Sequence, residues 1–433
     1  MNNEFKGKRL LIYSGSDPMR EIISGCHRLG ITPVVTDYLP DSPAKKYADE
    51  NYMVSTIDID EIEKLCRDKK IDGIVTAFMD SMMFYCREAC DRMGYFFYAN
   101  KSQINIVANK AHFKNKCREF GVPIVPEPIS TENEDAIDPE KLDYPIVIKP
   151  VDGCGSKGLY TCFNSKDFKS IYLKSKSQSR CKDILIEKYM QGNEVCIYYA
   201  FQDGEITLTA MCDRYTNREQ TGYAPLPSAY IYPSKYLERY MKSVDRNMKA
   251  MFSSMGMKNG VAFVQAFADD KNFYIYEMGY RLCGAMEYRY LDYLYDENTL
   301  EMILRYSLTG KMADHRISER INPMFKKYCC KITPLLKKGV IAKIEGIDEI
   351  ENMQSTIGLY RIYKEGDAID DDSIGTLNQI LCRIFITSDT LTELKNTINH
   401  INSTIKVFDK DGNNMLLACF DTNILNEGYR EKL

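Results

Sequence analysis

The sequence predicts about three domains of α/β and α+β class, and three observations support this fold class. Its 433 residues exceed the roughly 100 to 200 residues typical of one domain. Near the N-terminus, short apolar strands alternate with helical patterns, which favours βαβ units and a parallel sheet. In the centre, several strands follow one another at close spacing, as in α+β domains. We expect an N-terminal α/β domain at 1–104, a central domain at 105–315 and a C-terminal α+β domain at 316–433.

The N-terminal domain is expected to provide a scaffold and one wall of a cleft. Its predicted elements are a strand at 9–15, a helix at 19–29, a strand at 32–38, a helix at 59–69, a strand at 72–78, a helix at 82–93 and a strand at 95–99. The turn after the first strand reads Gly15-Ser16-Asp17-Pro18. This is not GxGxxG, so the dinucleotide-binding fingerprint is absent.

Composition and charge exclude several classes of function. A net charge of -4 and a pI of about 5.8 do not provide the basic surface expected of a nucleic-acid binder. Four dispersed histidines argue against zinc hydrolysis and Ser-His-Asp catalysis. Fifteen cysteines follow no CxxC pattern and no signal peptide, and no apolar run approaches about 18 residues. We expect a cytoplasmic protein with reduced cysteines and small-molecule partners, bound to neither nucleic acid nor membrane; a homodimer is possible.

A glycine-rich segment after a buried strand is the first candidate for phosphate binding. It reads Asp152-Gly153-Cys154-Gly155-Ser156-Lys157-Gly158 and lies between two predicted strands. Glycines allow backbone N–H groups to approach an anion, while Ser156 and Lys157 add a donor and a charge. The segment is not a Walker A loop, because no helix opens after it. Lys149 closes the preceding apolar strand, where its ammonium needs an anion to offset desolvation.

A turn between two later strands is the second candidate element. DILIEKYM runs into a turn at Gln191-Gly192-Asn193, and EVCIYYAF returns as a strand. Such a hinge offers backbone groups to an adenine edge, and Glu194 is placed to accept from ribose hydroxyls. The residues assigned to the nucleotide here are Glu187, Lys188, Met190 and Glu194.

The third element is a hairpin that carries two oxygen ligands and an arginine. Strand alternation puts Glu277, Gly279 and Arg281 on one face, and the hairpin brings Gln265 alongside. Mg²⁺ needs few protein oxygens when nucleotide phosphates and water complete its octahedron, and an arginine stabilises charge on a transferring phosphoryl group. The alternative is a strand with a salt-bridged exposed face.

Taken in this order, the three elements resemble the ATP-grasp superfamily over about residues 105–315. The resemblance implies a mobile lid at about 126–190. It also implies that Lys110 and Lys149 contact ATP phosphates, that residues 153–158 cover them, that Glu187 to Met190 hold adenine and that Glu194 holds the ribose. The N-terminal domain resembles the one that precedes this fold in carbamoyl phosphate synthetases, biotin carboxylases, glycinamide ribonucleotide synthetases and L-amino acid ligases.

For the metal and the reaction, the same resemblance assigns Gln265 and Glu277 to Mg²⁺, with Mn²⁺ as a possible substitute, and Arg281 to the acyl phosphate and its transition state. Most relatives carry Asn where this chain has Gly279, which puts a second metal ion in doubt. Gln265 replaces the usual Glu, as in carbamoyl phosphate synthetases. Biotin carboxylases have a catalytic Glu where this chain has Ala285, so that activity is not expected.

The resemblance implies an ADP-forming ligase that activates a carboxylate as an acyl phosphate and joins it to an amine or a thiol. Arg214, Tyr288 and Arg289 are candidates for recognising substrate carboxylates or rings, although interdomain packing explains them equally well. Two alternatives remain open. One is carboxyphosphate or carbamoyl phosphate synthesis from bicarbonate, and the other is an ATP-binding protein that has lost catalysis.

Overall fold

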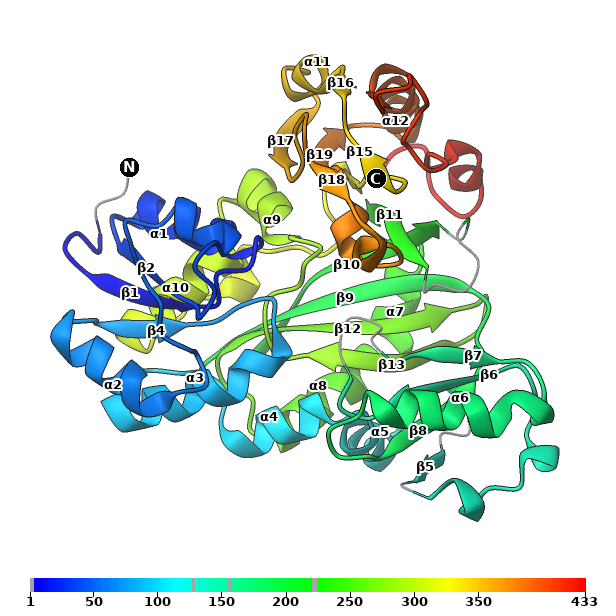
Figure 1. The fold of residues 1–433 in the computed structure, drawn as a ribbon, viewed down its shortest axis with the longest axis horizontal. Helices are drawn as coiled ribbons and strands as arrows, with labels where there is room; N and C mark the ends of the chain where they lie inside the picture. Colours follow the sequence, from blue (N-terminus) through cyan, green and yellow to red (C-terminus); the bar gives the residue numbers. More distant parts are fainter. Residues whose placement is uncertain (1–3, 127–128, 132, 154–157, 218, 220–224) are drawn as a thin grey trace.

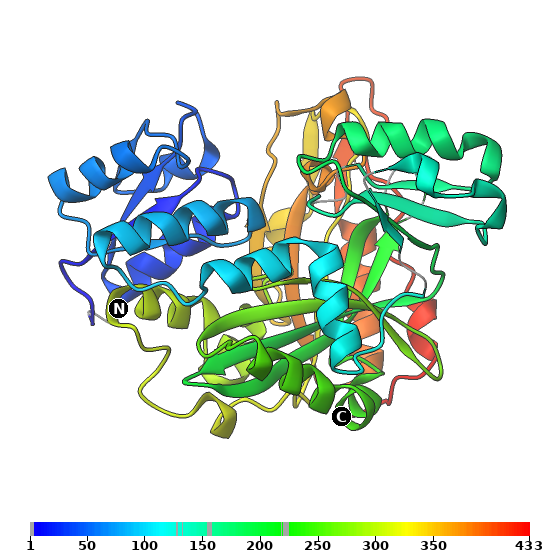
Figure 2. The ribbon, with the colours of Figure 1, turned by 90° about the horizontal axis from the view of Figure 1, so that it is seen from below.

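The structure is a computed structural model, which describes residues 4–126, 129–131, 133–153, 158–217, 219 and 225–433. Figure 1 shows an N-terminal α/β domain, a long central sheet, a small lid and a C-terminal domain. Figure 2, turned by 90°, places the N-terminal sheet and the lid at opposite ends of the central sheet. Along the described residues, no helix is long and apolar enough to cross a membrane.

The N-terminal domain contains the parallel sheet that the alternating pattern predicts. The strands follow the order β3-β2-β1-β4, and all pairs are parallel. Its elements are β1 (Arg9–Tyr13), α1 (Met19–Leu29), β2 (Thr32–Thr36), β3 (Glu50–Tyr52), α2 (Ile59–Asp68), β4 (Gly73–Val75) and α3 (Asp80–Met93). The strand predicted at 95–99 is wrong: the fourth strand is β3, and residues 95–99 lead into the next helix without pairing.

Two helices connect this domain to the lid. They are α4 (Lys101–Ala108) and α5 (Lys110–Glu119). The side chain of Asn109 separates them, because it accepts the backbone N–H groups of Ala111 and His112 and so caps α5. Lys110 is therefore the first residue of α5.

The lid is a four-stranded antiparallel sheet with the order β5-β8-β6-β7, covered by one helix. Its elements are β5 (Ile129–Thr131), β6 (Ile146–Pro150), β7 (Tyr160–Cys162), α6 (Ser165–Ser177) and β8 (Ile184–Lys188). Apolar residues of α6, such as Phe168 and Tyr172, pack on the sheet and form a small core with it.

The central sheet has eight antiparallel strands in the order β13-β12-β9-β10-β11-β14-β19-β17. They are β9 (Asn193–Gln202), β10 (Glu205–Asn217), β11 (Leu226–Tyr232), β12 (Gly260–Ala268), β13 (Phe273–Gly279), β14 (Tyr328–Ile332), β17 (Thr356–Arg361) and β19 (Cys382–Ser388). Because β11 pairs with β14, this sheet continues across the boundary expected at residue 315.

The two faces of the central sheet belong to two different cores, as period-2 alternation requires. On β9, Val195, Ile197 and Tyr199 face a core shared with α3, α4, α5, α7 (Leu237–Ser243) and α8 (Asp245–Ser254). Cys196, Tyr198 and Ala200 face the opposite core, shared with α1, α9 (Tyr288–Tyr295) and α10 (Thr299–Thr309). Residues of the N-terminal domain contribute to both cores.

The C-terminal strands of the sheet are covered by a further layer of short elements. These are β15 (Gly339–Val340), β16 (Lys343–Glu345), α11 (Ile347–Glu351), β18 (Ala368–Ile369), α12 (Leu391–Thr404) and β20 (Lys406–Phe408). Helix α12 packs its apolar residues, including Leu394 and Ile398, against β14 and β19. Every cysteine among the described residues is free, and most are buried.

Candidate functional site

A buried cluster of three charges connects the lid to α5. The Glu187 carboxylate forms an ion pair with Lys149 Nζ at 2.6 Å and a second, closer pair with Lys114 Nζ. The three side chains are 1 to 8% exposed. Lys149 and Glu187 share one face of the lid sheet, because the β6–β8 register pairs Lys149 with Leu185 and Val147 with Glu187. The cluster therefore ties two lid strands to the helix that carries Lys110.

The electrostatics of this cluster are those of an anion held between two cations. Burial alone would raise the pKa of the Glu187 carboxyl, but Lys149 and Lys114 outweigh it, so the pKa lies below its ordinary value. Burial lowers the pKa of the Lys114 ammonium more than Glu187 raises it. One carboxylate thus faces two ammonium groups, which leaves an excess of positive charge for a further anion.

Lys110 brings this region together with the hairpin of β12 and β13. Its Nζ lies 3.3 Å from Glu277 Oε1 and also donates to the carbonyl of Gly153, at the start of the glycine-rich segment. Lys149 Nζ lies 5.9 Å from the ring centre of Tyr276, the neighbour of Glu277. Both predicted phosphate-binding lysines therefore flank the strand that carries the predicted metal ligand.

The base of the glycine-rich segment is held in place. Asp152 accepts hydrogen bonds from Ser179 Oγ and from the backbone N–H groups of Arg180 and Cys181. At the other end, Gly158 has φ of +76°, and a Cβ there would lie 2.8 Å from Pro150 Cγ, so only glycine fits. Gly155, Ser156 and Lys157 lie outside the described residues.

The two predicted metal ligands are directly opposite each other on neighbouring strands. The register pairs Gln265 with Glu277, and Gln265 with Cys196 on the other side. Gln265 Nε2 donates to Cys196 Sγ at 3.7 Å, which leaves the amide oxygen of Gln265 available beside the Glu277 carboxylate. One carboxylate and one amide oxygen fit the hard oxygen donors that Mg²⁺ or Mn²⁺ prefers.

An aromatic ring fills the space beside Gly279. The register places Phe263 opposite Gly279, and a Cβ at Gly279 would lie 2.3 Å from Cε1 of Phe263. The Arg281 guanidinium packs over the same ring, 4.9 Å from its centre. An apolar ring therefore occupies the space that a larger side chain at residue 279 would need.

Arg281 is held by the N-terminal domain. Its Nε donates to Asp80 Oδ1 at 2.8 Å, a second bond joins Nη2 to Asp80 Oδ2, and Nη1 donates to the carbonyl of Leu282 at 2.9 Å. Asp80 is the first residue of α3, at the carboxyl end of β4. Burial disfavours the charged guanidinium, yet Asp80 raises the pKa of Arg281 above its ordinary value. This bidentate pair fixes the plane of the guanidinium.

The residues predicted to bind adenine and ribose differ in their burial and in their bonding partners. Glu194 is buried and pairs with Arg214, and the Tyr276 hydroxyl donates to its Oε2 at 3.4 Å. Lys188 is exposed and forms an ion pair with Asp143 at 2.9 Å. Met190 is half-buried in the turn that follows β8. The predicted ribose ligand is thus already bonded to one of the predicted substrate residues.

The other two substrate candidates contact the N-terminal domain. Arg289 Nη2 donates to Glu21 Oε1 at 2.7 Å, and the Tyr288 hydroxyl donates to Glu21 Oε2 at 2.9 Å. Arg289 also packs 4.9 Å from the ring centre of Phe385 on β19. These contacts join α9 to α1 and to the C-terminal strands, so interdomain packing is one role that both side chains fill.

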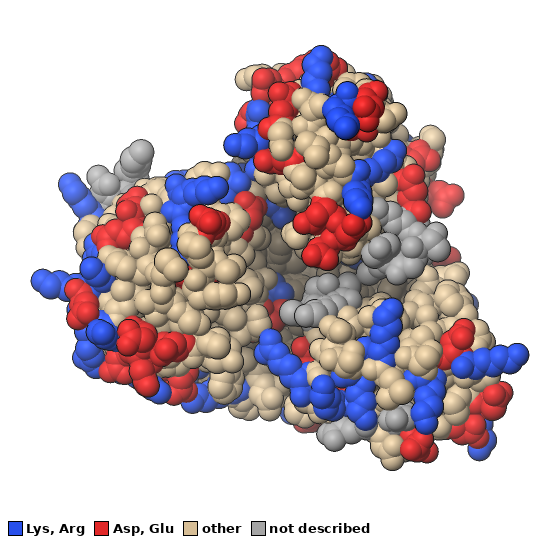
Figure 3. All heavy atoms as spheres, in the orientation of Figure 1, with Lys and Arg blue, Asp and Glu red and all other residues tan. Residues whose placement is uncertain are grey.

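Two residues of this site were absent from the sequence-based set. Lys114 lies four residues after Lys110, and this spacing on one helix face could have identified it. Asp80 follows β4 in the N-terminal domain, and only the fold brings it to Arg281. Figure 3 shows a hollow between the N-terminal domain, the C-terminal domain and the lid, with atoms of charged residues at its depth.

A small lid sheet and a large sheet enclose buried lysines and carboxylates between them. Residues 142–287 match the family model of the ATP-grasp domain. The chain therefore contains an ATP-grasp domain at these residues, as the resemblance of its motifs predicts.

Solved structures support the same fold along nearly the whole chain. The L-amino acid ligase of Bacillus licheniformis superposes with a TM-score of 0.76 at 16% identity, covering 94% of this chain and 99% of that protein. Phosphoribosylglycinamide synthetase of Anaerococcus prevotii gives a TM-score of 0.71 at 16% identity, covering 93% and 100%. The expected three-part ATP-grasp architecture, with an N-terminal parallel sheet, is therefore confirmed.

Curated relatives are distant. The large chain of carbamoyl phosphate synthase from Pyrococcus furiosus is 22% identical over 189 residues, which are 42% of this chain and 18% of that protein. The L-arginine-specific L-amino acid ligase of Bacillus subtilis is 20% identical over 306 residues, covering 69% of this chain and 70% of that protein. The chain spans less than half the length of several of these relatives.

Proposed function

We propose that this chain is an ATP-dependent ligase that joins a carboxylate to an amine or a thiol through an acyl phosphate, with release of ADP and phosphate. The observation that carries the proposal is the contact between Lys110 Nζ and Glu277 Oε1, 3.3 Å apart. It brings a cation of α5, the start of the glycine-rich segment and the Gln265–Glu277 pair to one point. Similarity to two L-amino acid ligases adds support.

In this proposal each charged group has a distinct task. Lys110 and Lys149 bind the phosphates of ATP, and Gln265 and Glu277 hold Mg²⁺, which neutralises phosphate charge when it is bound. The turn after β8, with Lys188 and Met190, borders the adenine, and Glu194 is close to the ribose. Residues 153–158 cover the phosphates.

Arg281 acts on the group that is transferred. A substrate carboxylate oxygen attacks the γ-phosphorus of ATP and ADP leaves, after which an amine attacks the acyl carbon, phosphate leaves and the amine loses a proton. A guanidinium fixed by Asp80 is preorganised to stabilise the charge that spreads over the phosphoryl oxygens. Because the Asp80 carboxylate already fixes its orientation, little reorganisation is needed at the moment of transfer.

An ATP-binding protein without ligase activity is the second candidate, and the Phe263 ring beside Gly279 favours it. Because residue 279 is a glycine, Gln265 and Glu277 are the two predicted metal-binding positions of this hairpin that carry an oxygen donor. One metal ion instead of two would lower phosphoryl transfer without abolishing nucleotide binding.

The test is a nucleotide-product assay on the full chain with Mg²⁺ and ATP. Amino acids, sugar acids, dicarboxylates and bicarbonate are supplied one by one, with and without amine or thiol acceptors. Acid-dependent formation of ADP and phosphate is the expected result, and bicarbonate alone should not produce it. Formation of AMP and pyrophosphate would contradict the proposal, and binding of Mg-ATP without turnover on any acid would leave the second candidate.

A further inference from the structure

Two buried cations on neighbouring strands of the central sheet have no carboxylate partner among the described residues. Lys331 on β14 is 2% exposed, and Arg383 on β19 is 7% exposed. Lys331 Nζ donates only to the carbonyl of Gly284, at 3.1 Å, and lies 4.0 Å from the ring centre of Tyr230. Arg383 packs 5.2 Å from the ring centre of Tyr360, and its buried Nη1 has no hydrogen-bond partner. Buried charges without such partners carry a large desolvation cost.

These cations belong to the same sheet face as the nucleotide site. Directly paired residues of antiparallel strands point to one face, and the register runs from Gln265 to Cys196, from Arg214 to Tyr230, from Tyr230 to Lys331 and from Lys331 to Phe385. Arg383 lies two residues before Phe385 on the same strand. The row of polar residues that begins at the hairpin therefore continues into the C-terminal strands.

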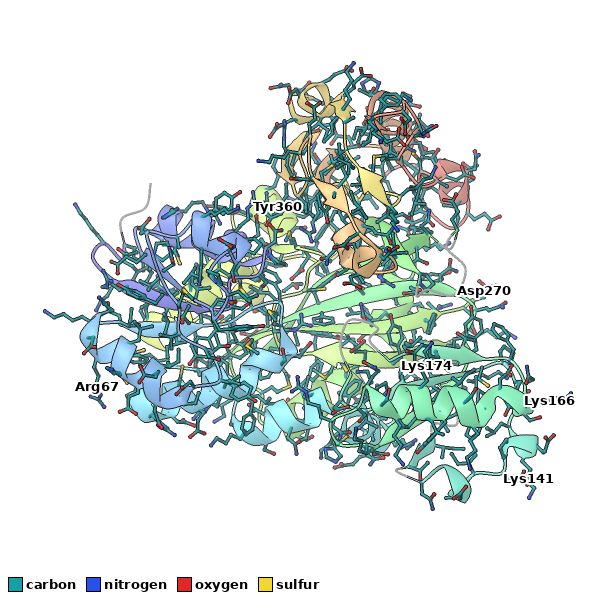
Figure 4. The ribbon with its side chains drawn as sticks, in the orientation of Figure 1. Arg67, Lys141, Lys166, Lys174, Asp270 and Tyr360 are labelled. Carbon is teal, nitrogen blue, oxygen red and sulfur yellow. The ribbon has the colours of Figure 1, made fainter. Side chains whose placement is uncertain are left out.

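The carboxyl ends of β1 and β4 in the N-terminal sheet lie beside this row of residues. Its order, β3-β2-β1-β4, reverses between β1 and β4, and ligands of open α/β sheets bind at the carboxyl ends of strands beside such a reversal. Asp17 follows β1 there and accepts a hydrogen bond from the Tyr360 hydroxyl at 2.8 Å. Figure 4 shows Tyr360 where the C-terminal domain meets the N-terminal domain. Asp80, which follows β4, holds Arg281 at the same edge.

The Arg281 guanidinium and the Lys331 ammonium are close enough for one small molecule to contact both. Arg281 Nη1 donates to the carbonyl of Leu282, and Lys331 Nζ donates to the carbonyl of Gly284. Two residues of extended chain span at most about 7 Å, so the two cations lie within about 13 Å of each other. One substrate with acidic groups at both ends can contact both cations.

The nearby buried carboxyl does not neutralise these cations. Burial raises the pKa of Glu287 to about 8, so this carboxyl is largely protonated at neutral pH. Burial and, to a smaller extent, the nearby Arg383 lower the pKa of the Lys331 ammonium to about 7. An anion bound between Lys331 and Arg383 would favour the charged ammonium and offset its desolvation.

We propose that Lys331 and Arg383 bind a second acidic group of the substrate, so that the acid activated beside Arg281 carries another carboxylate or a phosphate. This inference rests on the proposed ligase function, because Arg281 is taken as the position of the activated carboxylate. It narrows the substrate class to small molecules with two acidic groups. Among the described residues, neither Lys331 nor Arg383 forms an ion pair or a hydrogen bond with a predicted nucleotide or metal ligand, so the second acidic group and the nucleotide have separate binding residues.

The test compares each diacid with a counterpart that lacks the second acidic group, on the full chain, in the presence of Mg²⁺ and a non-hydrolysable ATP analogue. Binding is measured calorimetrically for glutarate against glutaramate, for L-glutamate against L-glutamine and for O-phospho-L-serine against L-serine. At least one diacid should bind on the order of 10- to 100-fold more tightly than its counterpart, as expected for a charge-assisted contact. The carboxylate and phosphate pairs distinguish the two sources of negative charge.

Two variants test whether Lys331 and Arg383 cause the tighter binding of the diacid. Lys331→Met and Arg383→Met should each reduce the preference at least tenfold and leave the affinity for the ATP analogue unchanged, which also verifies folding. Lys338→Met is the matched control, because Lys338 lies in the same domain, is exposed and pairs with Asp371. The proposal is overturned if no diacid is preferred by the wild-type chain, or if both variants keep the preference.

Different results would reject the proposed second acidic-group site and the proposed ligase function. A diacid that binds through Lys331 without causing ADP release would reject the ligase and retain the site. ADP release with a monoacid at equal rates in the wild type and in Lys331→Met would retain the ligase and reject the site.

Discussion

Replacing Glu187 by Gln removes the single anion of the buried Lys114–Glu187–Lys149 cluster without changing its shape. Both ammonium groups then face each other in a region that is at most 8% exposed. Loss of one partner of a buried ion pair costs about 3–5 kcal/mol, because the remaining charge is left uncompensated. Deprotonation of Lys114, whose pKa is already lowered, limits the cost. We expect Glu187→Gln to reduce the unfolding free energy by about 3 kcal/mol.

The pH dependence of this variant has a definite sign. The native Glu187 pKa lies below its ordinary value of 4.5, so its contribution is present above that value and is lost as pH falls through the native pKa. The difference between the wild type and Glu187→Gln should therefore shrink below pH about 4. Above neutral pH the variant should gain stability, because Lys114, whose pKa is lowered in the native chain, releases its proton more readily there than in the unfolded chain.

The assay is urea unfolding followed by far-UV circular dichroism, since the chain contains no Trp. Lys141→Met is the matched control, because Lys141 forms a lid ion pair with Asp138 and is 82% exposed; its position at the outer end of the lid is seen in Figure 4. Loss of this exposed pair should cost less than about 1 kcal/mol. If Glu187→Gln lies within about 1 kcal/mol of the wild type, the reasoning on the buried cluster is refuted.

Three further predictions concern the proposed reaction. Lys149→Ala should weaken binding of an ATP analogue about tenfold or more in calorimetry, because one phosphate contact is lost; unchanged affinity would contradict its role. Arg281→Ala should lower kcat by about 100-fold or more with little change in KM, since its charge matters most in the transition state, and Asp80→Asn should lower kcat less. Gly279→Asn should be destabilised by about 1–3 kcal/mol through overpacking against Phe263, and Phe263→Ala in the same chain should relieve this, as thermal unfolding of the single and double variants will show.

Local patterns predicted most of the N-terminal domain and the hairpin. The helix expected at 19–29 is observed as Met19–Leu29, ended by Gly30 with φ of +76°. The predicted hairpin brought Gln265 alongside Glu277, and the register pairs these two residues. The strand expected at 95–99 failed, because aromatic residues there pack into the core as a connection and not as a sheet strand.

Local sequence patterns could not predict contacts between segments that are far apart in the sequence. Glu187 was assigned to the adenine, but its side chain lies between Lys114 and Lys149, a position set by the packing of the lid on α5. Likewise, Arg281 and Asp80 are far apart in the sequence and meet only because β4 ends beside the central sheet. The substrate assignments of Tyr288 and Arg289 stay predictions, since both side chains already bond Glu21.

The ion pair of the predicted metal ligand Glu277 with Lys110 predicts how nucleotide binding depends on a metal ion. Glu277 is paired with Lys110, so a nucleotide phosphate that binds Lys110 must separate this pair and approach the carboxylate. Without a metal ion, the carboxylate and the phosphate would repel each other. With Mg²⁺ bound, both become ligands of the same cation.

Glu277→Gln should therefore weaken binding of the ATP analogue in the presence of Mg²⁺ and strengthen it in the presence of a chelator. The amide keeps the shape of the side chain but removes the charge that repels the phosphate. Calorimetric titrations of the wild type and the variant under both conditions give the coupling between metal and nucleotide, which we expect to fall about tenfold or more in the variant. An equal coupling in both proteins would mean that Glu277 holds no metal beside the nucleotide, and the arrangement of Lys110, Gln265 and Glu277 would then serve only the packing of α5 on the hairpin.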